Sequence, residues 1–160
     1  RRQRRTSLSK RMAGRVESVA IASESGARLE HLTAAVAVAG RGLEGDRNFR
    51  PADSGNARRN LTLIERDAYQ HLASLGINLA DDDLRRNLIV SDIKLNELVG
   101  RRFRVGEVEC LGTELCDPCR YIERRTTDGV LKGLVERGGL CAEILTSGRI
   151  AIGDSVEAID

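Results

Sequence analysis

Two cysteines separated by two residues are the sharpest chemical feature of this sequence. They form the segment Cys116-Asp117-Pro118-Cys119. Pro118 fixes one backbone angle and removes one amide donor, which stiffens the loop. Arg120, Arg124 and Arg125 follow closely, and nearby positive charge favours the nucleophilic thiolate over the thiol. The segment therefore predicts a loop that presents a reactive cysteine.

The residues alone leave four interpretations of these thiols open. A zinc site could recruit Cys110 and Cys141, but there is no second pair with this spacing, and His31 and His71 do not sit at ligand spacing. A thioredoxin-like pair would open a helix in a βαβ setting, which suits neither Pro118 nor the strand-rich surroundings. A single reactive cysteine assisted by the other thiol needs neither condition. Ordinary buried core thiols are the fourth interpretation.

A second chemical feature is a set of arginines in turns that carry Gly or Asn. A guanidinium binds phosphate with a fixed two-pronged geometry, so the set could hold a phosphorylated ligand. It could equally form exposed ion pairs with some of the 24 acidic residues. Asp46 could orient its neighbour Arg47, or serve only as a turn residue. The set comprises Arg47, Arg58, Arg59, Arg85, Arg86 and Arg137. No Ser-His-Asp set, HExxH motif or Walker loop is recognisable.

Many short strands, separated by turns roughly 8–12 residues apart, must position these groups. Residues 65–75 and 131–137 predict short helices, the first of them amphipathic. The helical segments are too few to suggest βαβ units. The pattern predicts a mainly β (α+β) fold: one strand-rich, barrel-like or sandwich-like domain over residues 15–160 with two or three short helices. Residues 1–14 predict a basic, disordered tail.

Composition narrows the function classes. Hydrophobic residues make up 41% of the 160 residues, which supports a globular core, whereas aromatic residues make up only 2%. So few aromatics argue against a surface that stacks nucleic-acid bases. Seven of the 26 basic residues lie in residues 1–15, which leaves 19 basic against 24 acidic residues in the rest. The basic tail could contact nucleic acid or an acidic surface, although a solvated, frayed terminus is the simpler interpretation.

No apolar stretch approaches the ~18 residues that span a membrane, and the basic start does not lead into the apolar segment of a signal peptide. We therefore expect a cytoplasmic protein with no membrane partner. Four cysteines in such a chain favour free thiols, metal ligands or catalytic groups over a disulfide framework.

The order and spacing of several segments resemble the landmarks of MOSC domains. The segments are GLEGDR at residues 42–47, RNLIV at 86–90, LGTELCDPC at 111–119, and the closing stretches RGGL at 137–140, GRI at 148–150 and GD at 153–154. The resemblance runs from about Val16 to the end of the chain. MOSC domains occur in molybdenum cofactor sulfurases, in amidoxime-reducing enzymes and as small standalone proteins.

This resemblance implies a barrel-like fold and a protein that handles the molybdenum cofactor (molybdopterin), a pterin with a phosphate group. It implies that Cys119 either carries sulfur for the cofactor or ligates molybdenum, with Cys116 as a helper. A soft thiolate suits both tasks.

The resemblance also implies a cofactor-binding set. Arg47, Arg86 and Arg137 would hold the phosphate or pterin, Asn87 would shape the pocket, and Asp46 would orient Arg47. Molybdoenzymes and a sulfur donor such as a cysteine desulfurase are the implied partners.

The resemblance leaves open whether the chain is an enzyme. The resemblance covers neither the aminotransferase-like domain that holds pyridoxal phosphate in the sulfurases nor the N-terminal β-barrel of the amidoxime-reducing enzymes. We therefore expect neither of these domains and no pyridoxal phosphate site. A sulfur carrier or transferase and a component of a molybdenum-dependent oxidoreductase are both compatible. Two alternatives belong to other classes: a non-enzymatic module that binds zinc through the CxxC segment and nucleic acid through the tail, and a structural domain with inert thiols.

Overall fold

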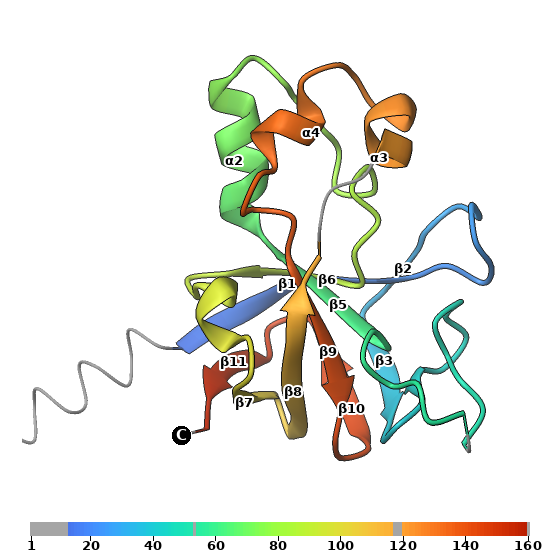
Figure 1. Ribbon diagram of the computed structural model, residues 1–160. Helices are drawn as coiled ribbons and strands as arrows, with labels where there is room; N and C mark the ends of the chain where they lie inside the picture. Colours follow the sequence, from blue (N-terminus) through green and yellow to red (C-terminus); the bar gives the residue numbers. More distant parts are fainter. Residues whose placement is uncertain (1–12, 53, 117–119, 160) are drawn as a thin grey trace, which may run out of the picture.

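The computed structural model describes residues 13–52, 54–116 and 120–159. The elements follow one another as shown in Figure 1. They are β1 (Ala13–Ile21), β2 (Glu30–Leu32), β3 (Ala34–Val38), β4 (Gly42–Leu43), β5 (Leu61–Glu65), α2 (Arg66–Ser74), β6 (Leu88–Ser91), the 3-10 helix η1 (Leu95–Leu98), β7 (Arg102–Val105), β8 (Val108–Leu115), α3 (Arg120–Arg125), α4 (Val130–Gly133), β9 (Leu140–Ile144), β10 (Gly148–Ala151) and β11 (Ser155–Ala158).

Seven strands close into a barrel within the described residues. Their order is β11-β7-β8-β9-β5-β6-β1, and β1 pairs back onto β11. The short strand β2 extends the sheet beyond β1, and β10, β3 and β4 form a smaller sheet. Closure removes the exposed edges that an open sheet would leave. The expected mainly β, barrel-like fold with short helices is confirmed.

The barrel contains one βαβ unit, and here the sequence-based expectation was wrong. β5 and β6 lie parallel, with Leu63 opposite Leu88, and α2 connects them. A parallel neighbour requires a crossover connection, usually a helix. α2 buries Ala68, Tyr69 and Leu72 on one face, so one amphipathic helix suffices for the crossover. A single helix among many strands gave too weak a signal for this local arrangement.

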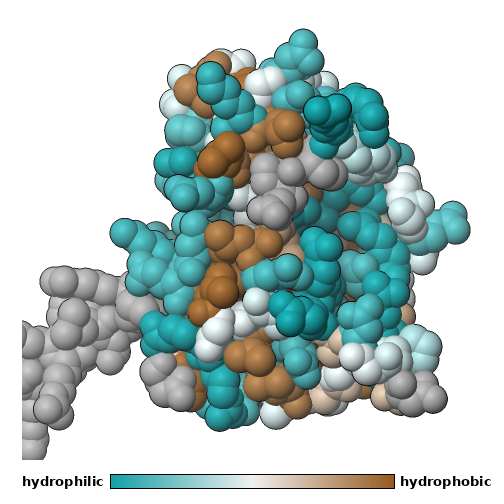
Figure 2. Space-filling model, viewed as in Figure 1, coloured by the Kyte–Doolittle hydropathy of each residue, from teal (hydrophilic) through white to brown (hydrophobic). Residues whose placement is uncertain are grey.

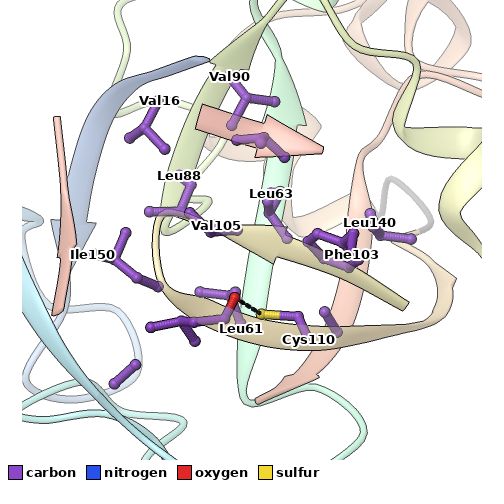
Figure 3. Close-up of a cluster of buried hydrophobic side chains, with 14 of the residues drawn as sticks. Val16, Leu61, Leu63, Leu88, Val90, Phe103, Val105, Cys110, Leu140 and Ile150 are labelled. Atoms are coloured by element: carbon purple, nitrogen blue, oxygen red, sulfur yellow. Dashed lines mark hydrogen bonds between the residues drawn. The ribbon is translucent and has the colours of Figure 1, made fainter. Parts of the chain in front are cut away.

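Two apolar clusters hold the layers together. The larger fills the barrel, where Figure 3 shows Val16, Leu63, Phe103 and Cys110 among the inward side chains. The smaller lies between the barrel and a layer formed by α2, α3 and α4, which Figure 1 shows at one end of the barrel. In the same view, Figure 2 shows patches of apolar surface over both the helices and the barrel, within a surface that is otherwise largely polar.

Most of the expected elements are present, with shifted ends. The predicted helix at 65–75 is α2, and the predicted hairpin across Gly106 joins β7 to β8. The helix expected at 131–137 is only the short α4, and α3 was not anticipated. β1 begins at Ala13, while residues 1–12 of the predicted tail lie outside the described part of the chain. None of the described helices combines the length and the apolar character needed to cross a membrane.

Gly139 fixes the approach of β9 to β5 and offers a test of this packing. Its φ is +106°, a Cβ there would collide with the backbone carbonyl of Leu63, and its own carbonyl accepts a hydrogen bond from the Cys116 amide at 2.8 Å. Gly100 also has a positive φ, of +75°, but a Cβ added there would meet no atom within 4 Å.

We expect Gly100→Ala to lower the free energy of unfolding by about 1–2 kcal/mol through backbone strain alone. Gly139→Ala should cost about 1–3 kcal/mol more, because a collision adds to the strain. Chemical denaturation of both variants measures the difference. Equal losses would contradict the close approach at Gly139.

Candidate functional site

The parallel pairing of β5 and β6 brings two copies of the same three-residue segment to one edge of the barrel. Arg58-Arg59-Asn60 immediately precedes β5, and Arg85-Arg86-Asn87 immediately precedes β6. Parallel strands in register start at the same edge, so the arginines before them lie near one another. The two asparagines secure the strand starts: the Asn60 side chain accepts from the Ile144 amide, and the Asn87 side chain accepts from the Thr62 amide.

These arginines line a cavity of about 500 Å³, which we call the arginine pocket. Its lining residues are Ser25, Gly26, Arg47, Arg59, Arg85, Arg86, Glu114, Leu115, Tyr121 and Ile122. Among the described lining residues, four guanidinium groups face a single carboxylate. Arg59 and Glu114 are 3.9 Å apart, and both side chains are substantially exposed, so this ion pair is weak. The pocket therefore carries a net positive charge.

The environment of Arg85 shows how strongly positive the electrostatic field in the pocket is. Its side chain is buried, its φ is +60°, and its guanidinium donates to the carbonyl of Ala27 at 2.7 Å. Burial lowers the pKa of Arg85, and the positive charges of Arg47 and Arg125 lower it further. Within the described residues, the ion pairs include neither Arg47 nor Arg85. A bound anion would supply the missing negative charge.

The structure brings part of the predicted cofactor-binding set into this pocket. Arg47 and Arg86 line it, and Arg86 is held by a hydrogen bond from its Nε to the carbonyl of Gly138 at 2.9 Å. Asn87 lies buried behind the pocket, where its amide bonds to β1 and β5 through Ala20 and Thr62. Those bonds give Asn87 a role in placing Arg86 rather than a direct contact with the pocket.

Asp46 and Arg137 lie elsewhere. The Asp46 carboxylate accepts from the backbone amides of Ala22 and Asn48, so it shapes the loop that carries Arg47 instead of pairing with the guanidinium. Arg137 is not a lining residue; its charge acts on Glu65, whose pKa is raised mainly by burial. Sequence reasoning left Arg59 and Arg85 out of the predicted cofactor set. The repeated Arg-Arg-Asn segment was the signal that could have included them.

A pair of thiols lies beside the arginine pocket. Cys116 directly follows β8 and Cys141 lies in β9, with their Sγ atoms 2.6 Å apart. A bulge in β8 between Gly112 and Glu114 makes this contact possible. A bulge shifts the alternation of side chains by one residue, so Cys116 leaves the barrel interior and joins Cys141 on the outer face. Cys119 lies outside the described residues.

The pair shares its charge unequally. The hydrogen bond from Cys116 and the guanidinium of Arg59 lower the pKa of Cys141, whereas the same hydrogen bond and burial raise that of Cys116. Ionisation of the pair is therefore favoured at Cys141 over Cys116. The hydroxyl of Thr113, in the bulge, lies within hydrogen-bonding reach of the carbonyls of Arg58 and Cys141, which keeps Arg59 next to Cys141.

A sequence profile of the MOSC domain matches residues 49–157. The chain belongs to the MOSC domain family. Solved structures that resemble it include the YuaD protein of Bacillus subtilis (TM-score 0.77, 17% identity, 92% of this chain and 96% of that one). YiiM of Escherichia coli is also similar (TM-score 0.67, 17% identity, 91% and 70%), as is YiiM of Geobacillus stearothermophilus (0.69, 10%, 92% and 75%). A search of curated proteins gave no match.

MOSC domains are associated with the molybdenum cofactor, and the arginine pocket suits the phosphate of such a group because its donors are mostly guanidinium groups. The described residues of this MOSC domain contain no group of three or more His, Cys, Asp or Glu side chains that could hold a metal ion. The zinc alternative depends on Cys119 and the nucleic-acid alternative on the tail, and both lie outside the described residues.

One further cluster departs from the expectation that the chain has no Ser-His-Asp set. Ser18 lies 3.4 Å from Nδ1 of His31, whose Nε2 contacts Asp82. The contact between Ser18 and His31 is longer than an ordinary hydrogen bond. None of the three residues lines a pocket within the described part of the chain. The His31–Asp82 contact ties β2 to the loop before β6.

The charge imbalance predicts that the pocket binds phosphate-class anions. Arg47→Met should weaken the binding of inorganic pyrophosphate about tenfold or more, because a hydrogen bond to a charged group contributes about 1.5–3 kcal/mol. Arg104→Met is the matched control, since Arg104 lies in β7, pairs with Glu109 and does not line the pocket. Calorimetric titration measures both affinities, and equal losses would contradict the assignment.

The position of Arg59 predicts a change in the titration of the thiol pair. Arg59→Met should raise the pKa of Cys141, because a positive charge beside the thiolate is removed. The ultraviolet absorbance of the thiolate, followed against pH, measures this shift. In a Cys141→Ser background only the weaker effect of Arg59 on Cys116 should remain, so the shift should be smaller. A shift of undiminished size there would assign the effect to another thiol.

Proposed function

We propose that this MOSC domain binds the molybdenum cofactor, with its phosphate in the arginine pocket and its reactive end near Cys119. One observation carries the proposal: four guanidinium groups face one carboxylate in a cavity whose lining includes Leu115 and Tyr121, the described residues on either side of the cysteine pair in the sequence. Few soluble ligands other than phosphate-bearing groups would satisfy so many arginines at once.

Two of the four arginines are held in advance, and this favours binding. Arg85 donates to the carbonyl of Ala27, and Arg86 donates to that of Gly138, so both side chains are ordered before a ligand arrives. Preorganised donors reduce the entropy lost on binding. Arg47 and Arg59 have no such tether to a backbone carbonyl among the described contacts, which leaves their guanidinium groups available to close on the anion.

We assign the reactive role to the thiolate of Cys119, which would either ligate molybdenum or carry sulfur. It lies three residues after Cys116, between β8 and α3, and α3 opens with Arg120 and ends with Arg125. When bound, the cofactor would supply redox chemistry at its metal centre. The residues of this chain would bind the phosphate, keep the thiolate charged through nearby arginines, and hold the loop through the Cys116 amide.

Cys119→Ser tests the proposal. We expect freshly purified wild-type protein, reconstituted with molybdenum cofactor, to retain molybdenum or a reducible extra sulfur, and the variant to lose it. Elemental analysis and intact mass before and after mild reduction give the readout. Pyrophosphate binding should stay within about twofold in the variant, because the arginine pocket is intact.

The matched control is Cys110→Ala, which removes a thiol inside the barrel that is fully buried and whose pKa is raised by burial to about 12. This variant should keep the metal or sulfur. Retention of both by Cys119→Ser would exclude Cys119 from the chemistry. Loss of pyrophosphate binding in Arg47→Met without loss of the cofactor would remove the arginine pocket from the proposal.

A further inference from the structure

Cys116 and Cys141 differ from Cys110 in having each other as neighbours. The Sγ atoms of Cys116 and Cys141 are 2.6 Å apart, and a disulfide bond is about 2.05 Å long, so the two atoms need to approach by only about half an ångström. Cys110 lies in the barrel core, where its Sγ faces the carbonyl of Val108 (Figure 3). Two thiols in contact can react together, whereas an isolated buried thiol is inert.

A route from solvent reaches one member of the pair. Cys116 lines a cavity of about 400 Å³ together with Leu115, Leu131, Val135 and Gly139. This cavity lies on the other side of Leu115 from the arginine pocket, since Leu115 lines both. Cys141 has no exposed surface and lies behind Cys116. Access from solvent therefore favours reaction at Cys116, with Cys141 as the second partner.

We propose that Cys116 and Cys141 form a redox pair that exchanges with low-molecular-weight disulfides entering through this cavity. The inference is independent of the molybdenum cofactor, since it needs only the described thiols and their access to solvent. Its substrate class is a small organic disulfide with an apolar or neutral body, because the cavity wall offers Leu115, Leu131 and Val135 beside the sulfur.

The exchange proceeds in two balanced steps. Cys116 transfers its proton to Cys141, and the Cys116 thiolate then attacks one sulfur of the small disulfide, forming a mixed disulfide and releasing one small thiolate. That thiolate takes the proton from Cys141, and the Cys141 thiolate attacks the Cys116 sulfur. The new Cys116–Cys141 bond forms as the mixed disulfide breaks and the second small thiolate leaves. The small disulfide is reduced by two electrons and the pair is oxidised by two.

Closure of the pair changes the arginine pocket. The Cys141 thiolate is the negative partner beside Arg59, and Arg59 also lines the pocket. A disulfide sulfur carries no charge, so oxidation leaves the Arg59 guanidinium without this partner. Arg59 then becomes a stronger donor to an anion in the pocket, and oxidation and anion binding favour each other.

Treatment of the reduced full chain with hydroxyethyl disulfide, a small neutral disulfide, tests the pair, with intact mass and peptide maps as the readout. We expect wild type to lose two hydrogen atoms reversibly and to yield a cross-linked peptide containing Cys116 and Cys141. Cys119→Ser should give the same cross-link. In the Cys119→Ser background, where the thiolate to which we assign the reactive role is absent, Cys141→Ser should stop at a mixed disulfide on Cys116. Cys110→Ala, the matched control, should close as wild type does.

Two outcomes would overturn the pair. One is a cross-link between Cys116 and Cys119 in place of Cys141, and the other is mixed disulfides alone in a wild-type protein that is shown to be folded by circular dichroism. The wild-type result does not depend on any variant folding. In the same Cys119→Ser background, Cys141→Ala should also stop at the mixed disulfide on Cys116. Because the alanine side chain cannot form a hydrogen bond, this variant shows that the result does not depend on the serine hydroxyl.

Pyrophosphate titration of the reduced and oxidised protein tests the connection to Arg59 separately. We expect oxidation to tighten binding about fivefold, the low end of typical coupling between two sites. In Arg59→Met the two forms should bind equally. If the reduced and oxidised wild-type proteins bind pyrophosphate with equal affinity, the connection between the thiol pair and the pocket is wrong. The existence of the Cys116–Cys141 disulfide is decided separately, by the peptide map.

Discussion

The parallel pairing of β5 with β6 is the constraint on which the candidate site depends. In an antiparallel arrangement the segments before these strands would lie at opposite edges of the barrel. The crossover through α2 places Arg59 and Arg86 at the same edge instead. The buried face of α2 stabilises this crossover and thereby helps to hold both arginines at one edge of the barrel.

The bulge in β8 is a second constraint, and it acts on sulfur rather than on charge. Regular alternation from Cys110 would point Cys116 into the barrel, where it would be an inert core residue. The extra residue at Thr113 reverses the alternation, so Cys116 faces outward and lies diagonally across from Cys141, whose direct partner in the ladder is Glu114. The Thr113 hydroxyl in the bulge lies within hydrogen-bonding reach of the carbonyls of Arg58 and Cys141, which links the segment before β5 to the same place.

These two constraints explain which parts of the molecule the sequence could predict. Strand content, the barrel and the amphipathic α2 follow from local apolar patterns, and they were predicted. The pairing partner of a strand is a long-range property, so the parallel β5–β6 pair was missed, and with it the joint role of Arg59 and Arg85. The bulge in β8 could not be predicted either, because one extra residue in a strand does not change the composition of the segment. Cys141 was therefore considered only as a zinc ligand and not as a neighbour of Cys116.

The three described cysteines show why burial alone does not define a thiol's chemistry. Cys110 and Cys141 are equally buried, with no exposed surface. Burial raises the pKa of Cys110, yet the hydrogen bond from Cys116 and the charge of Arg59 lower that of Cys141 against the same effect of burial. The difference lies in what each sulfur faces: a backbone carbonyl inside the barrel, or a second thiol and a guanidinium outside it. Since Arg59 belongs to both environments, the thiolate on Cys141 and an anion in the arginine pocket compete for one positive charge. If the pair is oxidised as we propose, the chemical state of the sulfurs changes how strongly Arg59 attracts that anion.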